Sequence, residues 1–325
     1  MCAWNPFPAE GSPNRLRREP SAILALMNVK YSVADSSSIA ALIRLLRPTH
    51  WIKNIFVFAG ILFGVKFSIP AFVHATLLAV AAFCLMSSCV YILNDYLDRE
   101  SDRIHPVNRH RPIASGRITA FPALSVAAVC LCMSALIAWL AGPRVLAIVL
   151  IYLGINCAYS LRLKKDAVVD VFCIAAGFML RILAGTWGIG IPPSGWLMLT
   201  GMFLTLFLGF AKRRAEWRDL GGEAKPRIVL NDYSQPLLDS FLSITLTGTA
   251  LCYGLFTLDP QTIALHHTNK LIYTMPLVLF GLFRYLFILY SCKKGENPSV
   301  DIFADPPILL CGLAYLGSTI WILNG

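Results

Sequence analysis

Residues 71–102 read AFVHATLLAVAAFCLMSSCVYILNDYLDRESD, an apolar run that passes directly into a cluster of acidic side chains. The run from 71 to 93 is long enough to cross a bilayer as a helix, because about 20 predominantly apolar residues span its hydrocarbon core. Charged groups at the end of such a span are expensive to hold there and usually serve chemistry. The stretch therefore predicts a transmembrane helix with a functional site at its end.

The composition extends this prediction to the rest of the chain. Hydrophobic residues make up 57% of the 325 positions, charged residues make up 14%, and the mean hydropathy of +0.64 exceeds what a soluble core requires. We therefore predict an all-α polytopic membrane protein with about nine transmembrane helices. The first and fourth spans are short enough to be tilted or partly re-entrant. The spans are predicted at 52–69, 71–93, 120–141, 145–160, 167–186, 194–211, 237–258, 271–290 and 307–323.

The Lys and Arg residues predict how these spans are oriented. With the N-terminus in the cytoplasm, 23 of the 28 Lys and Arg residues fall on the cytoplasmic side, as the positive-inside rule requires. This orientation places the acidic cluster in the cytoplasm, within reach of phosphorylated metabolites. We therefore expect a multi-pass protein of the plasma (inner) membrane with a cytoplasmic N-terminus.

The remaining bulk properties exclude other classes and divide the chain. The net charge of +10 does not indicate nucleic acid as a partner, because the cations are spread over short loops without a binding motif; lipid attraction and the positive-inside bias explain it. The ten cysteines show no zinc or disulfide spacing. Proline and basic residues before residue 40 predict a disordered basic tail at 1–40, which leaves 41–325 as a single integral-membrane catalytic domain.

The acidic cluster predicts a metal site. Asp95, Asp98 and Asp102 stand at i, i+3 and i+7, which on a helix confines them to an arc of about 60° and a length of roughly 10 Å. Three like charges on one face repel each other, and a divalent cation relieves that repulsion. Hard oxygen ligands with room for water and phosphate suit Mg²⁺. The candidate metal ligands are Asn94, Asp95, Asp98 and Asp102.

A second polar segment, 159–170, reads YSLRLKKDAVVD and carries Asp166 and Asp170 at i, i+4 beside two lysines. A salt-bridged helix end explains such a pair equally well. Asp170 lies one turn deeper, where solvation is poorer, and is the better functional candidate. Lys164 is the better phosphate partner.

Three other polar segments are candidates for binding phosphate. The Arg-rich segment 103–116 is either a solvated basic loop or an anion-binding loop, since Arg makes fork-shaped contacts with phosphate. The segment 47–54 is either an interfacial anchor or brings its last two residues into the site. The segment 212–216 is either a positive-inside stop signal or an ion pair that orients a cation. The candidate substrate-binding residues are Lys53, Asn54, Arg103, Arg109, Arg111, Tyr159, Lys212, Arg213 and Glu216.

One cation is predicted inside a span. Arg181 lies eleven residues after Asp170, hence about 20° away on the same helical face. It either lines the same cavity or extends outward along the helix.

Together, these residues resemble the UbiA superfamily of intramembrane prenyltransferases over residues 44–323. The resemblance implies helices around a central cavity and a diphosphate bound through Mg²⁺ that two Asp-rich motifs hold. It leaves a homo-oligomer open, since the family has trimeric members. The residues that carry it are Asn94-Asp95-x-x-Asp98-x-x-x-Asp102 and the Tyr159-Ser160 segment that ends at Asp170.

Within that superfamily, four motifs resemble the decaprenyl-phosphate phosphoribosyltransferase branch. The resemblance implies transfer of 5-phosphoribosyl from phosphoribosyl diphosphate to a polyprenyl (decaprenyl-type) phosphate, with release of diphosphate. It also makes Asp95, Asp98, Asp102, Lys164 and Asp170 the catalytic residues. Arg214 stands where that branch commonly has an aromatic residue, which leaves the acceptor's chain length open. The motifs are Arg47-Pro48-x-x-Trp51-x-Lys53-Asn54, the run from His105-Pro106 to Gly116, Lys212-Arg213-x-Ala215-Glu216, and the later Tyr273-Thr274.

Two alternatives remain. A prenyltransferase that moves a prenyl group from prenyl diphosphate to an aromatic acceptor would use the same metal site, but the polar, Arg-rich loop 99–117 favours a ribose phosphate donor. A non-enzymatic membrane transporter would more often show inverted repeats and broken spans, and the sequence shows no internal repeat.

Overall fold

The computed structural model describes residues 38–64, 68–104, 108–219, 228–291, 302 and 304–324, and these residues form helices and connecting turns without a β-strand. The predicted tail at 1–40 lies outside the described residues except for its last three positions, which open helix α2 (Ser38–Leu46). Residues 105–107 of the Arg-rich loop also lie outside them.

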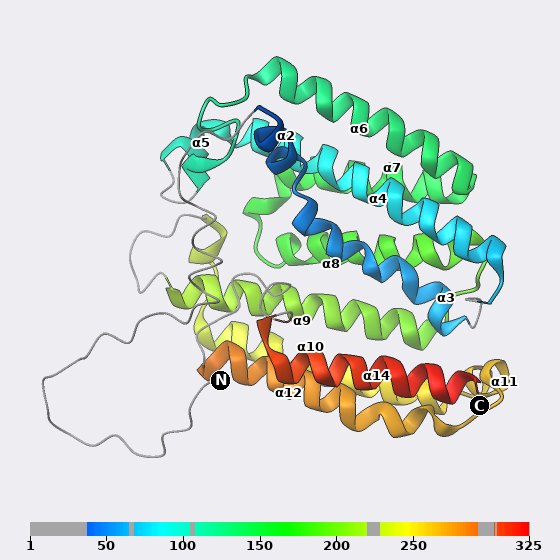
Figure 1. Cartoon of the computed structure of the whole chain (residues 1–325). Coiled ribbons are helices and arrows are strands. Elements are labelled where there is room, and N and C mark those ends of the chain that lie inside the picture. The colour runs from blue at the N-terminus through cyan, green and yellow to red at the C-terminus, as the bar shows by residue number, and fades with distance from the viewer. Residues whose placement is uncertain are drawn as a thin grey trace, which may run out of the picture.

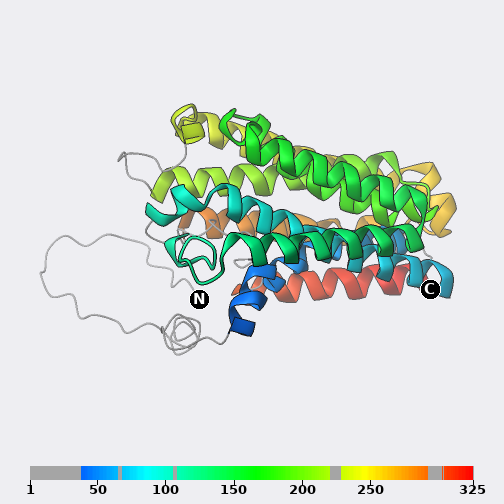
Figure 2. The ribbon, with the colours of Figure 1, turned by 90° about the horizontal axis from the view of Figure 1, so that it is seen from above.

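Eight helical segments in the described part of the chain are long and apolar enough to cross a membrane. They lie side by side in one bundle (Figures 1 and 2). The predicted all-α membrane fold is therefore confirmed, and the chain is an integral membrane protein. The segments are α4 (Pro70–Leu97), α6 (Ala120–Ala141), α7 (Pro143–Leu161), α8 (Val169–Gly185) with η5 (Trp187–Ile189), α9 (Gly195–Asp219), α10 (Gln235–Leu258), η7 (Lys270–Thr274) with α12 (Met275–Ser291), and α14 (Pro306–Asn324).

Helix α8 joins the two halves of the bundle. One apolar core lies among α4, α6 and α7 and includes Leu180 and Ala184 of α8. A second core lies among α9, α10 and α12 and includes Val171 and Ala175 of the same helix. Because both halves pack on α8, polar residues of this helix are buried between them.

The polar motifs gather at one end of the bundle, which we call the motif end. It holds three short elements: α5 (Arg99–Ile104), η3 (Asn108–His110) and η4 (Leu163–Lys165). Helices α3 (Ala59–Phe63) and α11 (Pro260–His266) lie at the opposite end, as Figure 1 shows.

The first predicted span, 52–69, is not a regular α-helix. Residues Pro48–Phe58 form an 11-residue 3₁₀-helix, η2, and the five residues of α3 follow it. At about 2.0 Å per residue for the 3₁₀-helix and 1.5 Å for the α-helix, the two together extend roughly 30 Å, close to the thickness of a hydrocarbon core. The segment therefore runs the length of the bundle (Figure 1) with a tighter helix than predicted.

A three-residue repeat explains why η2 is a 3₁₀-helix, in which residues three apart eclipse each other. Ile52 and Ile55 face outward, with 40% and 54% of their surface exposed, whereas Asn54 and Val57 are fully buried at 0%. In an α-helix, residues three apart would be offset by about 60° instead of eclipsing. The remaining face carries Arg47 at its start, His50 and Lys53.

Two glycines fix this segment against α8. A Cβ atom added at Gly60 would lie 1.6 Å from the Gly185 carbonyl oxygen, and one added at Gly185 would lie 1.7 Å from the Val57 carbonyl oxygen. Neither backbone can move away cheaply, so only glycine permits the crossing. The crossing places the polar face of η2 beside the buried part of α8.

Candidate active site

The first acidic motif lies where α4 ends. Asp98 caps α4 and α5 follows without a loop, since the Asp98 N–H donates to the Asn94 carbonyl at 2.9 Å and the Asp102 N–H donates to the Asp98 carbonyl at 2.8 Å. Because helical hydrogen bonding continues through the junction, Asp95 and Asp102 keep the common face that their spacing predicts. Both are buried, at 1% and 4% exposure.

Each carboxylate of this motif faces a cation from another segment. Arg47 Nη2 lies 2.6 Å from Asp95 Oδ1. Arg111 Nη1 bridges two carboxylates, at 3.2 Å from Asp95 Oδ1 and 2.6 Å from Asp102 Oδ2. This bridge shows that Asp95 and Asp102 share one site with a residue of the Arg-rich loop.

Lys164 completes the first motif from η4, with its Nζ 2.5 Å from Asp98 Oδ1. Close by, the Ser160 hydroxyl donates to Asn94 Oδ1 at 3.0 Å. The two polar segments, some 65 residues apart in the chain, therefore meet at the motif end. Arg47 was not among the predicted site residues. The sequence feature that marks Arg47 is its place at the start of the Arg47-Pro48 motif. Its backbone is left-handed (φ 51°), and η2 begins at the next residue.

Asp170 lies in a separate, fully buried network. Its Oδ2 accepts from Arg213 Nε at 2.6 Å, and its Oδ1 accepts from the Tyr233 hydroxyl at 3.1 Å. The Tyr233 oxygen in turn accepts from the Val168 N–H at 2.6 Å. Both Asp170 oxygens are thus occupied, and the geometry shows it orienting Arg213.

Tyr233 is a site residue that the sequence analysis missed. It follows η6 (Ile228–Asn231), 63 residues after Asp170, and no motif marks it. Burial, together with the neighbouring Asp170 carboxylate, raises the pKa of the Tyr233 phenol to about 12. The hydroxyl therefore keeps its proton at neutral pH and donates a hydrogen bond to Asp170.

The predicted ion pair of the 212–216 segment is present. Arg213, with 1% of its side chain exposed, pairs with Glu216, and Lys212 Nζ lies 3.9 Å from Glu216 Oε1. Tyr159 lies within electrostatic range of Arg213. Arg213 Nη2 is buried without a hydrogen-bond partner among the described residues. Asp170 and Glu216 therefore hold a guanidinium that retains one free donor.

Several predicted site residues lie apart from the carboxylates of the two acidic motifs, and Lys53 on η2 is one of them. Arg103 is exposed and pairs with Glu100 at 2.9 Å. Arg109 is exposed beside His110. Asn54 is fully buried, and its Oδ1 accepts from Arg181 Nε at 2.7 Å. Their roles in substrate binding remain predictions.

Arg181 points into the bundle, which excludes the alternative that it extends outward along the helix. Besides Asn54, its guanidinium donates to the Gly177 carbonyl at 2.7 Å, to Ser87 Oγ at 3.2 Å and to the Tyr152 hydroxyl at 3.1 Å. All of these acceptors are neutral, and Arg181 forms no ion pair within the described part of the chain. A buried positive charge therefore lies about 16 Å deeper along α8 than Asp170.

The carboxylates of the first motif fit a divalent cation. In the described ranges, no three His, Cys, Asp or Glu side chains already converge as a metal site, because the carboxylates face Arg and Lys instead. Asp95 Oδ2, however, is buried without a hydrogen-bond partner. This oxygen and those of Asp98 and Asp102 are the hard donors that Mg²⁺ prefers.

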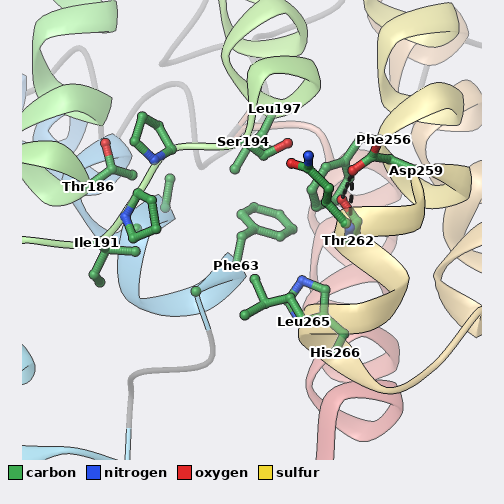
Figure 3. Close-up of a pocket in the computed structure, with 16 residues that line it drawn as sticks. Phe63, Thr186, Ile191, Ser194, Leu197, Phe256, Asp259, Thr262, Leu265 and His266 are labelled. Atoms are coloured by element: carbon green, nitrogen blue, oxygen red, sulfur yellow. Dashed lines mark hydrogen bonds between the residues drawn. The ribbon is translucent and has the colours of Figure 1, made fainter.

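A cavity of about 240 Å³ lies at the opposite end of the bundle (Figure 3). Phe63, Phe256 and Leu265 give it an apolar wall, and Thr186, Asp259 and His266 add polar groups. It contains none of the predicted site residues, so the acidic motifs and this cavity are separate features.

Comparison with known proteins identifies the family. Residues 54–303 match the model of the UbiA prenyltransferase family. The decaprenyl-phosphate phosphoribosyltransferase of Mycolicibacterium smegmatis is 31% identical over 86% of this chain and 91% of its own length. The Mycobacterium tuberculosis protein of the same name is 33% identical over 68% and 75%. A solved structure of a UbiA homologue from Archaeoglobus fulgidus, bound to GPP and Mg²⁺, shares the fold with a TM-score of 0.66 and 20% identity, over 88% of this chain and all of that one. The chain therefore belongs to the UbiA prenyltransferase family and is a transferase.

Proposed function

We propose that this transferase moves 5-phosphoribosyl from phosphoribosyl diphosphate to a polyprenyl phosphate of the decaprenyl type. The observation that carries the proposal is the arrangement of Arg47, Arg111 and Lys164 around the three carboxylates of the first motif. The donor carries a diphosphate and a second phosphate on a polar sugar, and it matches a site rich in both carboxylates and cations. The relatives that are about a third identical over most of the chain have names that agree with this substrate pair.

The residues of the first motif would act on the leaving group. Asp95, Asp98 and Asp102, with Asn94 beside them, would hold Mg²⁺, which supplies Lewis-acid stabilisation of the diphosphate when it is bound. Arg111 and Lys164 would turn from carboxylate to phosphate oxygens and stabilise the negative charge that develops there. These cations already lie at the site, so little reorganisation is needed.

The chain does not need to supply a nucleophile. The bond from C1 of the ribose to the diphosphate oxygen breaks, and a bond from C1 to an oxygen of the acceptor phosphate forms, with inversion at C1. The acceptor phosphate is anionic at neutral pH, so general-base catalysis contributes little. Asp170, Tyr233 and Glu216 would position Arg213 so that its free Nη2 reaches an anionic substrate group.

A second candidate function is prenyl transfer from a prenyl diphosphate to an aromatic acceptor. The observation in its favour is the fold shared with a UbiA homologue that binds GPP and Mg²⁺. It would use the same carboxylates but would leave the polar, cationic surroundings of Arg47 and Arg111 without a sugar phosphate to bind.

For the location, we propose the plasma membrane, with the motif end and the N-terminus in the cytoplasm. The positive-inside bias supports this orientation, and the cytoplasm supplies a phosphorylated sugar donor. The single catalytic domain at 41–325 and assembly as a homo-oligomer remain proposals.

Purified full-length protein, labelled phosphoribosyl diphosphate, Mg²⁺ and polyprenyl phosphate test the function. We expect labelled product in the lipid phase only when both substrates and the metal are present. An Asp98→Asn variant is the matched negative control. Prenylation of an aromatic acceptor, without any labelled lipid, would reject phosphoribosyl transfer and support the second candidate.

A further inference from the structure

Lys53 is a partly buried cation, and the charged groups nearest to it are all cations. In the part of the chain that the structure describes, its ammonium group makes no hydrogen bond or ion pair. The charged groups within its electrostatic range are Lys212, Arg181 and Arg47. An uncompensated charge in a buried position is destabilising, and like charges beside it add to the cost. An anion from outside the chain would relieve this arrangement.

His50 lies one 3₁₀ turn before Lys53 on the same face of η2 and shows the same imbalance. Its Nδ1 is buried without a hydrogen-bond partner among the described residues, and its ring packs edge-on against Tyr91 at 5.0 Å. Arg47, Lys53, Lys212 and Arg111 are the charged groups around it. An imidazole nitrogen can donate to a phosphate oxygen, so His50 and Lys53 point to the same kind of ligand.

This group of cations is distinct from the first acidic motif. Arg47 separates the two, because its guanidinium contacts Asp95 Oδ1 at 2.6 Å and lies over the Tyr91 ring at 5.3 Å. On one side of Arg47 the carboxylates prefer a metal-bound diphosphate. On the other side, His50 and Lys53 prefer a second anion that brings no metal.

The surroundings of Lys53 favour an amphiphilic anion over a sugar phosphate. One turn deeper, about 6 Å along η2, the same face continues as Phe56, which packs edge-on against Phe178 at 5.1 Å. Ile52 and Ile55, on the adjoining face, expose apolar side chains. A ligand here would therefore place its anionic head near Lys53 and its apolar body along the aromatic pair.

We propose that Lys53, with His50 and Lys212, binds the phosphate of the polyprenyl phosphate acceptor, on the opposite side of Arg47 from the donor's diphosphate. The assignment of this ligand as the acceptor rests on the proposed function. It divides the cations of the motif end into two sets. Arg111 and Lys164 serve the donor, whereas Lys53 and His50 serve the lipid.

Binding of farnesyl monophosphate to the purified full-length protein tests this division, with EDTA present and phosphoribosyl diphosphate absent. We expect the wild type to bind it and Lys53→Met to raise the Kd tenfold to hundredfold, the usual effect of a lost charged contact. Lys53→Arg should bind within a few-fold of the wild type, and His50→Gln should weaken binding several-fold. Lys164→Met, and Lys270→Met at the exposed opposite end, should leave this Kd unchanged.

A parallel titration with phosphoribosyl diphosphate and Mg²⁺ supplies the other half of the test. Lys164→Met should weaken the binding of phosphoribosyl diphosphate, and Lys53→Met should not. The inference is overturned if wild type fails to bind farnesyl monophosphate, or if Lys53→Met weakens donor binding alone. The second result would leave phosphoribosyl transfer standing. Lipid binding that depends on Lys53, in a protein that forms no ribosylated lipid, would support the phosphate site and reject the proposed function. If Lys53→Met does not fold, His50→Gln decides by the same two titrations.

Discussion

Replacing Asp170 with Asn removes the negative charge between Arg213 and Tyr233 while keeping the side chain's shape. Both members of the Asp170–Arg213 pair are buried, with side-chain exposures of 0% and 1%. Removing one partner of a buried ion pair costs about 3 kcal/mol, because it leaves the other charge without compensation. Glu216 remains on the guanidinium but is itself 18% exposed, so it compensates only in part.

The expected result is a protein that still inserts but unfolds at lower temperature. A loss of about 3 kcal/mol corresponds to a fall of about 6 °C in Tm at the ~2 °C per kcal/mol of a large domain. Thermal unfolding in detergent, followed by tryptophan fluorescence, measures it. Asp166→Asn, at an exposed site in the same segment, is the matched control and should stay within about 0.5 kcal/mol of the wild type.

A double-mutant cycle then identifies the partner. The Asp170→Asn change should cost much less in an Arg213→Met background, with a coupling of at least about 1 kcal/mol. If instead Asp170→Asn left Tm unchanged and abolished turnover, Asp170 would be a ligand of the metal or substrate. The positioning role derived from its two hydrogen bonds would then be wrong.

Four further results follow from the same geometry. Asp98→Asn should abolish turnover yet change the free energy of unfolding by less than about 1 kcal/mol, because its partner Lys164 is 26% exposed. Retained activity with unchanged Mg²⁺ dependence would contradict the assignment of Asp98 to the metal site. Because burial raises the pKa of Tyr233 to about 12, above its ordinary value, its hydroxyl contributes stability that is constant below about pH 10 and is lost as the pH rises toward 12. The difference in Tm between wild type and Tyr233→Phe should therefore be constant from about pH 6 to 9 and shrink above pH 10. A change in this difference near neutral pH would contradict the raised pKa of Tyr233. Gly185→Ala should prevent folding, since the new Cβ would lie 1.7 Å from a backbone oxygen, and recovery of folded protein at wild-type yield would show that the crossing adapts. In a cysteine-free background, a Cys at exposed Arg109 should label only from the cytoplasm and one at exposed Lys270 only from outside; the reverse pattern would overturn the orientation.

Local sequence determined the transmembrane spans and the common helical face of the carboxylates in the first acidic motif. In a bilayer, each backbone polar group must be satisfied within its own helix, so an apolar run of sufficient length is enough to predict a span. The common face of Asp95 and Asp102 follows from the 3.6-residue period, and the bridge through Arg111 agrees with it. The apolar length of 52–69 predicted a transmembrane helix there, but it could not predict that Pro48–Phe58 would form a 3₁₀-helix. Asn54 and Val57, three residues apart and both buried, reveal the 3₁₀ period only in the structure.

Only the tertiary structure decided which charges meet. Tyr233 reaches Asp170 from 63 positions away, and Arg181 reaches Asn54 from 127 positions away. Such pairs depend on how α8 packs between the two halves of the bundle and on the glycine contact that fixes η2 against it. A sequence records which helices form, because that is a local balance of burial and backbone hydrogen bonding. It does not record which side chains face each other across them, because that depends on the packing of segments far apart in the chain.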